Sequence, residues 1–76
     1  MPKVNPDIIH WARETAGLTL EEAAKKLKLH QARGVSAVDR LSALESGDDH
    51  PTRSLLTRMA KQYRRPLLTF YMTAPP

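Results

Sequence analysis

Histidine and carboxylate side chains are the residues of this chain whose types suit metal binding or proton transfer. The three histidines are scattered along the chain without ligand spacing, and no cysteine accompanies them: His10, His30 and His50. Zinc sites need such ligands at short, fixed spacings, so we expect no metal. Glu14 beside His10, and Glu21 beside Glu22, have the residue types of acid–base pairs. Because no glycine-rich phosphate loop or nucleophile motif joins them, we expect neither catalysis nor a cofactor.

Phosphate binding by lysine and arginine is the chemistry that remains. The chain of 76 residues has 12 Lys plus Arg against 8 Asp plus Glu, a net charge of +4. Two basic segments flank an acidic one. Residues 25–33 and 53–65 contain no acid, whereas residues 39–49 carry four acids and a lone Arg40. This distribution is compatible with a nucleic-acid partner without requiring one.

Short helices are the elements predicted to position these charges. Asn5, Thr19, Ser36 and Thr52 are each predicted to be an N-cap, with Glu22 completing a capping box after Thr19. Gly17 and Gly47 are expected to end the first and third helices, and Pro66 to end the fourth. We expect a second helix over residues 20–27, a loop over residues 28–35 and a fifth helix over residues 67–72. The prediction is an all-α fold of five short helices, with one domain over residues 1–73 and the start of a linker at residues 74–76.

Size and hydropathy exclude some classes of protein. A domain of this length buries only about 60–65% of the surface that its unfolded chain exposes, so its core is thin. No apolar run approaches the ~18 residues of a membrane span, and the first four residues do not resemble a signal peptide. The absence of cysteine fits a reducing compartment, so we expect a cytoplasmic protein with no membrane partner.

Several motifs together resemble the phage-repressor-like (Xre/Cro) helix-turn-helix family. They are Arg13 followed by residues 17–24 (Gly-Leu-Thr-Leu-Glu-Glu-Ala-Ala), then residues 44–47 (Leu-Glu-Ser-Gly), then Pro51-Thr52. The resemblance covers nearly the whole chain and implies a lambda-repressor-like fold with a lengthened loop between the second and third helices. It also implies a buried ion pair between Arg13 and Glu45, whose loss would strand a charge at a cost of about 3–5 kcal/mol.

The resemblance further implies that the third helix enters the major groove of double-stranded DNA, while the start of the second helix contacts phosphate. Carried over by position, the base-facing residues include Ala37, Val38, Asp39, Ser42 and Ala43. None is an Arg, Lys, Asn or Gln, the types that read base edges bidentately. The remaining expected DNA contacts are Thr19, Lys25, Lys26, Arg33, Ser36, Arg40, Thr52 and Arg53. We therefore expect a DNA-binding transcriptional regulator of bacterial type, whose affinity comes mainly from phosphate.

The tail, residues 59–71 with Pro75-Pro76, resembles the N-terminal module that precedes ImmA/IrrE-type zinc metallopeptidase domains. This implies that the chain is the front of a longer protein, although the His-Glu-x-x-His signature of that enzyme is absent here. The apolar residues of the tail suggest two partners, a second copy or a downstream domain: Leu67, Leu68, Phe70 and Tyr71. A degenerate helix-turn-helix that serves protein interaction, and an antitoxin-like repressor, remain the alternatives to DNA binding.

Overall fold

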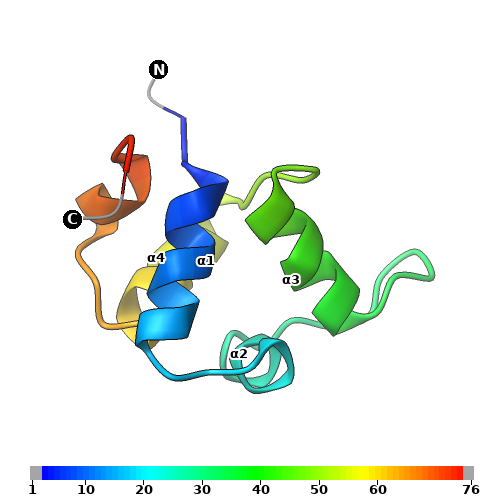
Figure 1. The fold of residues 1–76 in the computed structure, drawn as a ribbon. Coiled ribbons are helices and arrows are strands. Elements are labelled where there is room, and N and C mark those ends of the chain that lie inside the picture. The colour runs from blue at the N-terminus through cyan, green and yellow to red at the C-terminus, as the bar shows by residue number, and fades with distance from the viewer. Residues whose placement is uncertain (1–2, 75–76) are drawn as a thin grey trace.

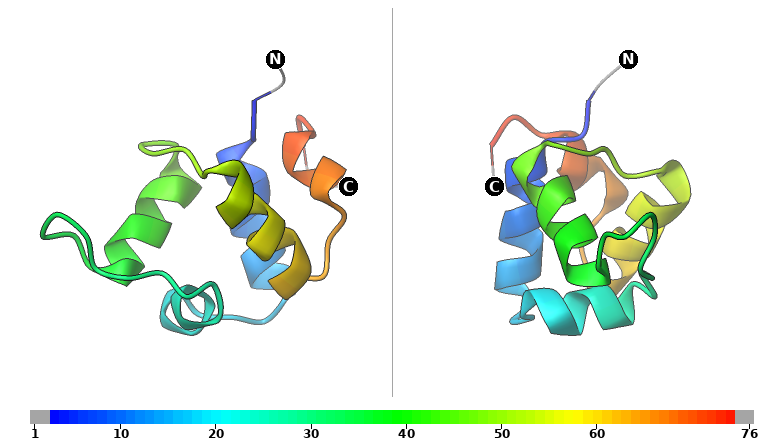
Figure 2. Two further views of the ribbon diagram at one scale, coloured as in Figure 1. Left: turned by 180° about the vertical axis from the view of Figure 1, so that it is seen from behind. Right: turned by 90° about the vertical axis from the view of Figure 1, so that its right-hand side faces the viewer.

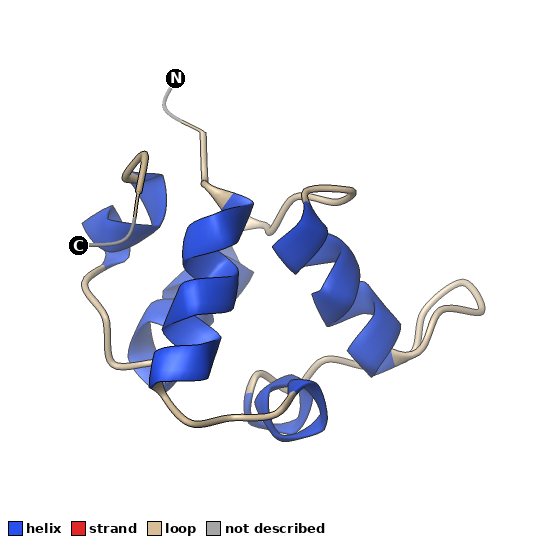
Figure 3. Ribbon diagram, viewed as in Figure 1, coloured by secondary structure: helices blue, strands red, loops and turns tan. Residues whose placement is uncertain are grey.

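The fold consists of short, capped helices, and the longest connection is the loop between the second and third helices. The computed structural model describes residues 3–74 (Figure 1). It contains four α-helices and one 3₁₀ helix within those residues: α1 Pro6–Thr15, α2 Leu20–Lys26, α3 Ala37–Ser46, α4 Arg53–Gln62 and η1 Leu67–Tyr71. The all-helical class is confirmed, and no strand forms in the described part of the chain (Figure 3). Of the predicted linker, residues 75–76 lie outside the described residues.

The expected fifth α-helix is instead the 3₁₀ helix η1. Pro66 removes one backbone donor at its start, and the short segment closes through i→i+3 bonds from the Thr69 amide to the Pro66 carbonyl and from the Met72 amide to the Thr69 carbonyl. The tighter winding places Leu67 and Phe70, three residues apart, on the same face. Phe70 is fully buried there.

All four predicted N-caps are present. In each, the side-chain oxygen accepts a hydrogen bond from a backbone amide at 3.0–3.1 Å: Asn5 from Asp7, Thr19 from Glu22, Ser36 from Asp39, and Thr52 from Leu55. The Glu22 carboxylate also accepts from the Thr19 amide at 3.0 Å, which completes the capping box. Each cap contributes about 1 kcal/mol, a large share for so thin a core.

Three helices end in Schellman turns, only one of which uses glycine. Gly17 has a φ of 76° at the end of α1, while Lys28 and Arg64 each adopt a φ of 57° after α2 and α4. In all three turns the two expected backbone bonds are formed, such as Leu29 amide to Ala24 carbonyl at 3.0 Å after α2. The left-handed conformation costs a non-glycine residue about 1–2 kcal/mol, so the packing that follows Lys28 and Arg64 offsets this strain.

One hydrophobic core holds the helices together. It contains residues from every helix: Ile8, Ile9, Ala12, Ala23, Ala24, Leu27, Leu41, Leu44, Leu55, Leu56, Met59, Tyr63 and Phe70. α1 packs against α3 on one side and against η1 on the other, and α2 runs across the end of α1 and α3 (Figures 1 and 2). α3 is therefore held by both α1 and α2, and its opposite side stays open to solvent.

Candidate nucleic-acid interface

The loop between α2 and α3 ends in a small, regular hairpin. Ala32 and Val35 exchange backbone hydrogen bonds of 3.0 and 2.9 Å, and the two residues between them, Arg33 and Gly34, have φ values of 53° and 77°. Positive φ at both central positions is the mark of a type I′ turn, whose twist suits a two-residue hairpin. The turn fixes Arg33 at the exposed tip of a loop that leaves the body of the fold (Figures 1 and 2).

Arg40 connects this hairpin to α3. Its Nη1 donates to the His30 carbonyl at 2.6 Å, and its side chain lines an open hollow of about 430 Å³ together with Arg33. From α4, Arg58 donates through Nη1 to the Leu27 carbonyl at 3.0 Å. Two arginines from two helices thus bind carbonyls at the start of the same loop. The sequence predicted Arg40 as a phosphate contact but gave no signal for the contact of Arg58.

The outward face of α3 is polar and acidic. Its exposed residues are Asp39, Ser42 and Ser46, and Asp48 follows directly, where it accepts a hydrogen bond from the Ser46 hydroxyl at 3.1 Å. The other expected base-facing residues, Ala37, Val38 and Ala43, are half-buried. This face therefore offers no cationic or amide donor to a base edge, and its carboxylates oppose a phosphate backbone.

The lysines of α2 stand four residues after glutamates. Glu21 and Glu22 precede Lys25 and Lys26 by one helical turn, a spacing at which opposite charges attract, so the net charge of α2 is zero. Hydrogen bonding with Thr19 lowers the pKa of Glu22, and the bond with the Thr19 backbone has a larger effect than the one with its side chain. At the start of α2, where a phosphate contact was expected, the Thr19 hydroxyl already accepts a hydrogen bond from the Glu22 amide, and the charged Glu22 carboxylate would repel a phosphate.

The remaining predicted contacts lie apart from one another. Thr52 lines a second hollow, of about 260 Å³, with Arg40 and Arg58, and Arg53 is exposed at the start of α4. Lys26 instead borders a different hollow, at the ends of α1 and α4, with Arg64 and Arg65. The structure thus gathers Arg33, Arg40 and Thr52 on one side of α3 and leaves Thr19, Lys25 and Lys26 outside that group.

A buried cluster of charges fixes α3 to α1. Arg13 donates from Nε to Glu45 Oε2 at 2.7 Å and from Nη2 to Glu45 Oε1 at 3.0 Å, while its Nη1 donates to the Leu18 carbonyl at 2.8 Å. The two side chains are only 11% and 7% exposed. The hydrogen bonding of the Arg13 side chain to the Glu45 carboxylate is the main cause that raises the pKa of Arg13. The expected pair thus joins α1, the turn after it and α3.

His10 extends this cluster toward solvent. Its Nδ1 lies 2.8 Å from Glu45 Oε1, and its Nε2 lies 2.9 Å from Glu14 Oε1. When Nδ1 carries the proton and donates to Glu45, it does not accept a hydrogen bond from Arg13 Nη2, which lies 3.3 Å away. Only the doubly protonated imidazolium donates to both carboxylates. Nearby, burial raises the pKa of the Tyr63 hydroxyl. The negative charge of Glu45 raises this pKa further, and the positive charge of Arg13 lowers it.

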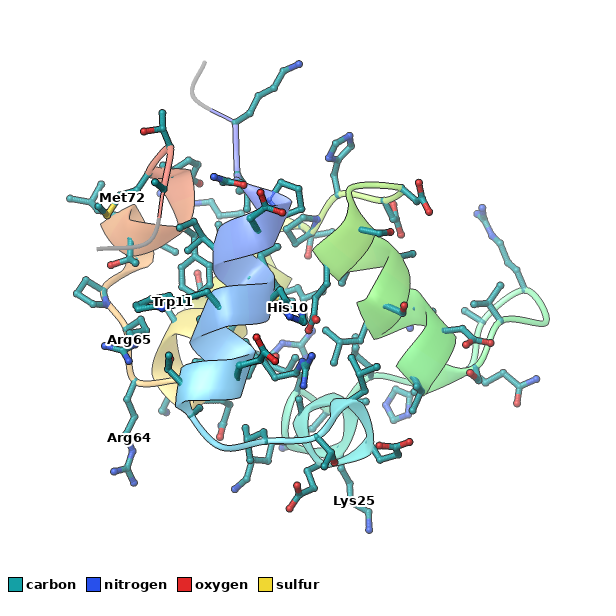
Figure 4. All side chains as sticks on the ribbon, viewed as in Figure 1. His10, Trp11, Lys25, Arg64, Arg65 and Met72 are labelled. Atoms are coloured by element: carbon teal, nitrogen blue, oxygen red, sulfur yellow. The ribbon has the colours of Figure 1, made fainter. Side chains whose placement is uncertain are left out.

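Arg65 packs on the only tryptophan of the chain. Its guanidinium carbon lies 4.6 Å from the centre of the Trp11 ring, and its Nη2 donates to the Thr15 hydroxyl at 3.0 Å (Figure 4). Trp11 is half-buried. Because the guanidinium packs on the ring, that face of Trp11 is not open for stacking on a base, and two neutral contacts hold the Arg65 side chain in place. The sequence gave no sign of this contact.

The C-terminal apolar residues are only partly available for docking. Leu68 is 79% exposed and Met72 is 40% exposed, and Leu67 and Tyr71 are half-buried. Phe70, expected to join them in a docking surface, is 0% exposed, so that expectation is wrong. The reason is the 3₁₀ winding of η1, which turns Phe70 into the core against α1 and α4.

Residues 3–74 hold no group of three His, Cys, Asp or Glu side chains placed to bind a metal ion. Nor does any helix of that range have the length and apolar character needed to cross a membrane. No protein-family model matches the chain, and no curated protein or solved structure matches it.

Proposed function

We propose that this chain is a DNA-binding module of the helix-turn-helix type, with the hairpin and α3 as its DNA-binding part. The observation that carries the proposal is the ordered hairpin: between Glu22 and Asp39 the chain has no acid, and Arg33 at the tip stands beside Arg40 on α3. Cations held on a rigid projecting element, next to a helix N-terminus, suit the phosphates of a duplex.

Two further features support the phage-repressor-like assignment. The α1 helix, its Gly17 turn and the capping box of α2 follow one another in the order that the resemblance implies. The Arg13–Glu45 pair sets the position of α3 against α1. A helix fixed in this way presents its N-terminal turn, with Ser36, at a constant angle. We propose that the module serves a transcriptional regulator with a further domain.

The expected binding is governed by phosphate more than by sequence. The outward face of α3 lacks the side chains that read bases bidentately, whereas Arg33, Arg40 and Arg53 are available to phosphates. With about three such contacts, the logarithm of the affinity should fall with the logarithm of the salt concentration with a slope near −3. Specificity, where present, would come from methyl contacts by Val38 or Ala43, or from DNA shape.

Selection from a randomised duplex library, with the bound pool titrated against salt, tests this proposal. Retention of the duplex with a salt slope near −3 supports DNA binding, and an enriched motif would add sequence-specific regulation. If the protein fails to retain any duplex at low salt, DNA binding is refuted.

The exposed apolar residues favour a second candidate, a protein-interaction module or an antitoxin-like repressor. Leu68 within η1 and Met72 directly after it are exposed, and Leu67 and Tyr71 of the same helix are half-buried. Met72 is labelled in Figure 4. Such a surface fits a second copy or a downstream domain. Sedimentation of the chain at micromolar concentration tests self-association: a Leu68→Glu variant should turn a dimer into a monomer. A strict monomer in the unchanged protein removes the homodimer.

A further inference from the structure

Two adjoining hollows lie along the side of α3 that faces α4. The hollow beneath the hairpin and the hollow between α3 and α4 share two lining residues, Arg40 and Asp49. Arg33 lines the first hollow and Arg58 the second. In side view, the hairpin and α4 both lie on one side of α3, opposite α1 (Figure 2, right). We call this hollowed surface, with Arg33, Arg40 and Arg58, the arginine groove.

Two of the three arginines, Arg40 and Arg58, are held in place without being neutralised. Arg40 and Arg58 each donate one Nη1 bond to a backbone carbonyl, of His30 and Leu27. Among residues 3–74, every ion pair within 4.0 Å involves only the α1–α3 cluster of His10, Arg13, Glu14 and Glu45. A carbonyl restrains a guanidinium but leaves its positive charge and its other donors free. Ordering these side chains in advance reduces the entropy lost on binding.

A single carboxylate opposes these charges within the groove. Asp49 is exposed at the junction of the two hollows, and its Oδ1 accepts only a local bond from the His50 amide at 2.8 Å. The outward face of α3 differs. It carries Asp39, the exposed Asp48 lies just after the helix, and none of the exposed positions of this face holds a lysine or arginine. A polyanion therefore meets more positive potential in the groove than on the outward face.

We propose that the arginine groove takes the phosphate backbone of duplex DNA, so that the duplex crosses the hairpin side of α3 and not its outward face. The guanidinium groups of Arg33, Arg40 and Arg58 donate to successive phosphate oxygens, for which the planar fork of arginine is suited. This inference rests on the proposed DNA binding and adds to it the surface, the contact residues and the role of Arg58.

Two carboxylate variants identify the surface that faces the duplex. Asp49→Asn and Asp39→Asn each remove one negative charge, and affinity for a short mixed-sequence duplex is measured for both across a range of salt. Asp49→Asn should raise the affinity about three- to tenfold at 0.1 M salt, and Asp39→Asn should raise it less. A gain in affinity cannot arise from loss of folding. An equal gain in both variants, or a larger gain from Asp39→Asn, overturns the groove.

A matched pair on α4 tests the arginine that the groove adds. Arg58→Gln should weaken binding about five- to tenfold and flatten the salt slope by about 0.9, the amount expected for one phosphate. Lys61→Gln removes the same charge from an exposed position that lines neither hollow and should change neither quantity. Equal losses from both variants would overturn the groove in favour of a general charge effect. If the unchanged protein binds no duplex at low salt, the proposed function itself fails, a separate outcome.

Discussion

The two sides of α3 use arginine in opposite ways. Toward α1, Arg13 forms a bidentate pair with Glu45, is nearly buried and carries no uncompensated charge. Toward α4, Arg40 and Arg58 bind neutral carbonyls and keep their charge in contact with solvent-filled hollows. The same residue type thus stabilises the fold on one side and leaves a cationic surface on the other. The difference is the partner: a carboxylate neutralises the guanidinium, whereas a carbonyl only orients it.

The largest expected effect comes from breaking the α1 side. Glu45→Ala would leave Arg13 buried without its counter-ion, which should lower the free energy of unfolding by about 3–5 kcal/mol. For a domain of this size, that loss leaves much of the population unfolded at 37 °C. Urea titration followed by circular dichroism measures it. A loss below about 1 kcal/mol would show that the pair behaves as a surface salt bridge.

Breaking the other side should alter binding and leave the fold intact. Arg33→Asn removes the charge at the hairpin tip, yet asparagine before glycine is the preferred sequence of a type I′ turn. We expect unfolding to be unchanged and duplex affinity to fall about five- to tenfold, equally on all sequences. Fluorescence anisotropy with two unrelated duplexes, paired with a thermal melt, measures both. Unchanged affinity would remove the hairpin from the interface.

A smaller effect on stability is expected at Lys28, at the start of the loop that Arg40 and Arg58 contact. Lys28→Gly relieves the left-handed backbone after α2, where φ is 57°, and should raise the free energy of unfolding by up to about 1 kcal/mol. The gain is bounded because glycine also loosens the unfolded chain. Chemical denaturation of this variant measures the change. A destabilised variant would mean that the packing of the Lys28 aliphatic chain stabilises the fold by more free energy than the left-handed backbone costs.

The smallest effect concerns the acid that balances the lysines of α2. The pKa of Glu22 is lowered in the fold, so its charged form contributes stability above the unfolded pKa, and this contribution is lost as pH falls through the folded pKa. Glu22→Gln should therefore be slightly less stable than the unchanged protein at pH 7. The difference should vanish in strong acid. Melts from pH 7 to pH 2 measure it, and a constant difference would contradict the charge-based explanation.

The caps show what was readable from sequence alone. Asn5, Thr19, Ser36 and Thr52 begin helices as predicted, because a short polar side chain followed by a helical pattern is a local signal. Gly17 and Gly47 end helices as predicted, and this signal also depends only on the neighbouring sequence. By contrast, the left-handed Lys28 and Arg64 were not predictable, since the strain there is offset by packing that the local sequence does not encode.

The contacts of the candidate site were the least predictable part. Residues 28–35 were expected to form a loop, but Arg33-Gly34 is an unusual I′ pair, and the hairpin was not foreseen. Arg58 reaches Leu27 from 31 positions away, and Arg65 reaches Thr15 from 50 positions away. Long side chains choose such partners only after the helices have packed. The residue types therefore predict that the chain binds phosphate, which stays a prediction, but they do not indicate which arginines lie together.

One side chain near the start of the chain joins its two ends. Asn5 donates through Nδ2 to the carbonyls of Met72 and Thr73 at 3.1 and 3.0 Å, and its amide donates to the Phe70 carbonyl at 2.9 Å. The segments at residues 3–5 and 72–74 therefore lie side by side, at the opposite end of the fold from the hairpin (Figure 1). A circular permutant with these segments linked and new termini in the turn at residues 48–50 would keep every helix whole.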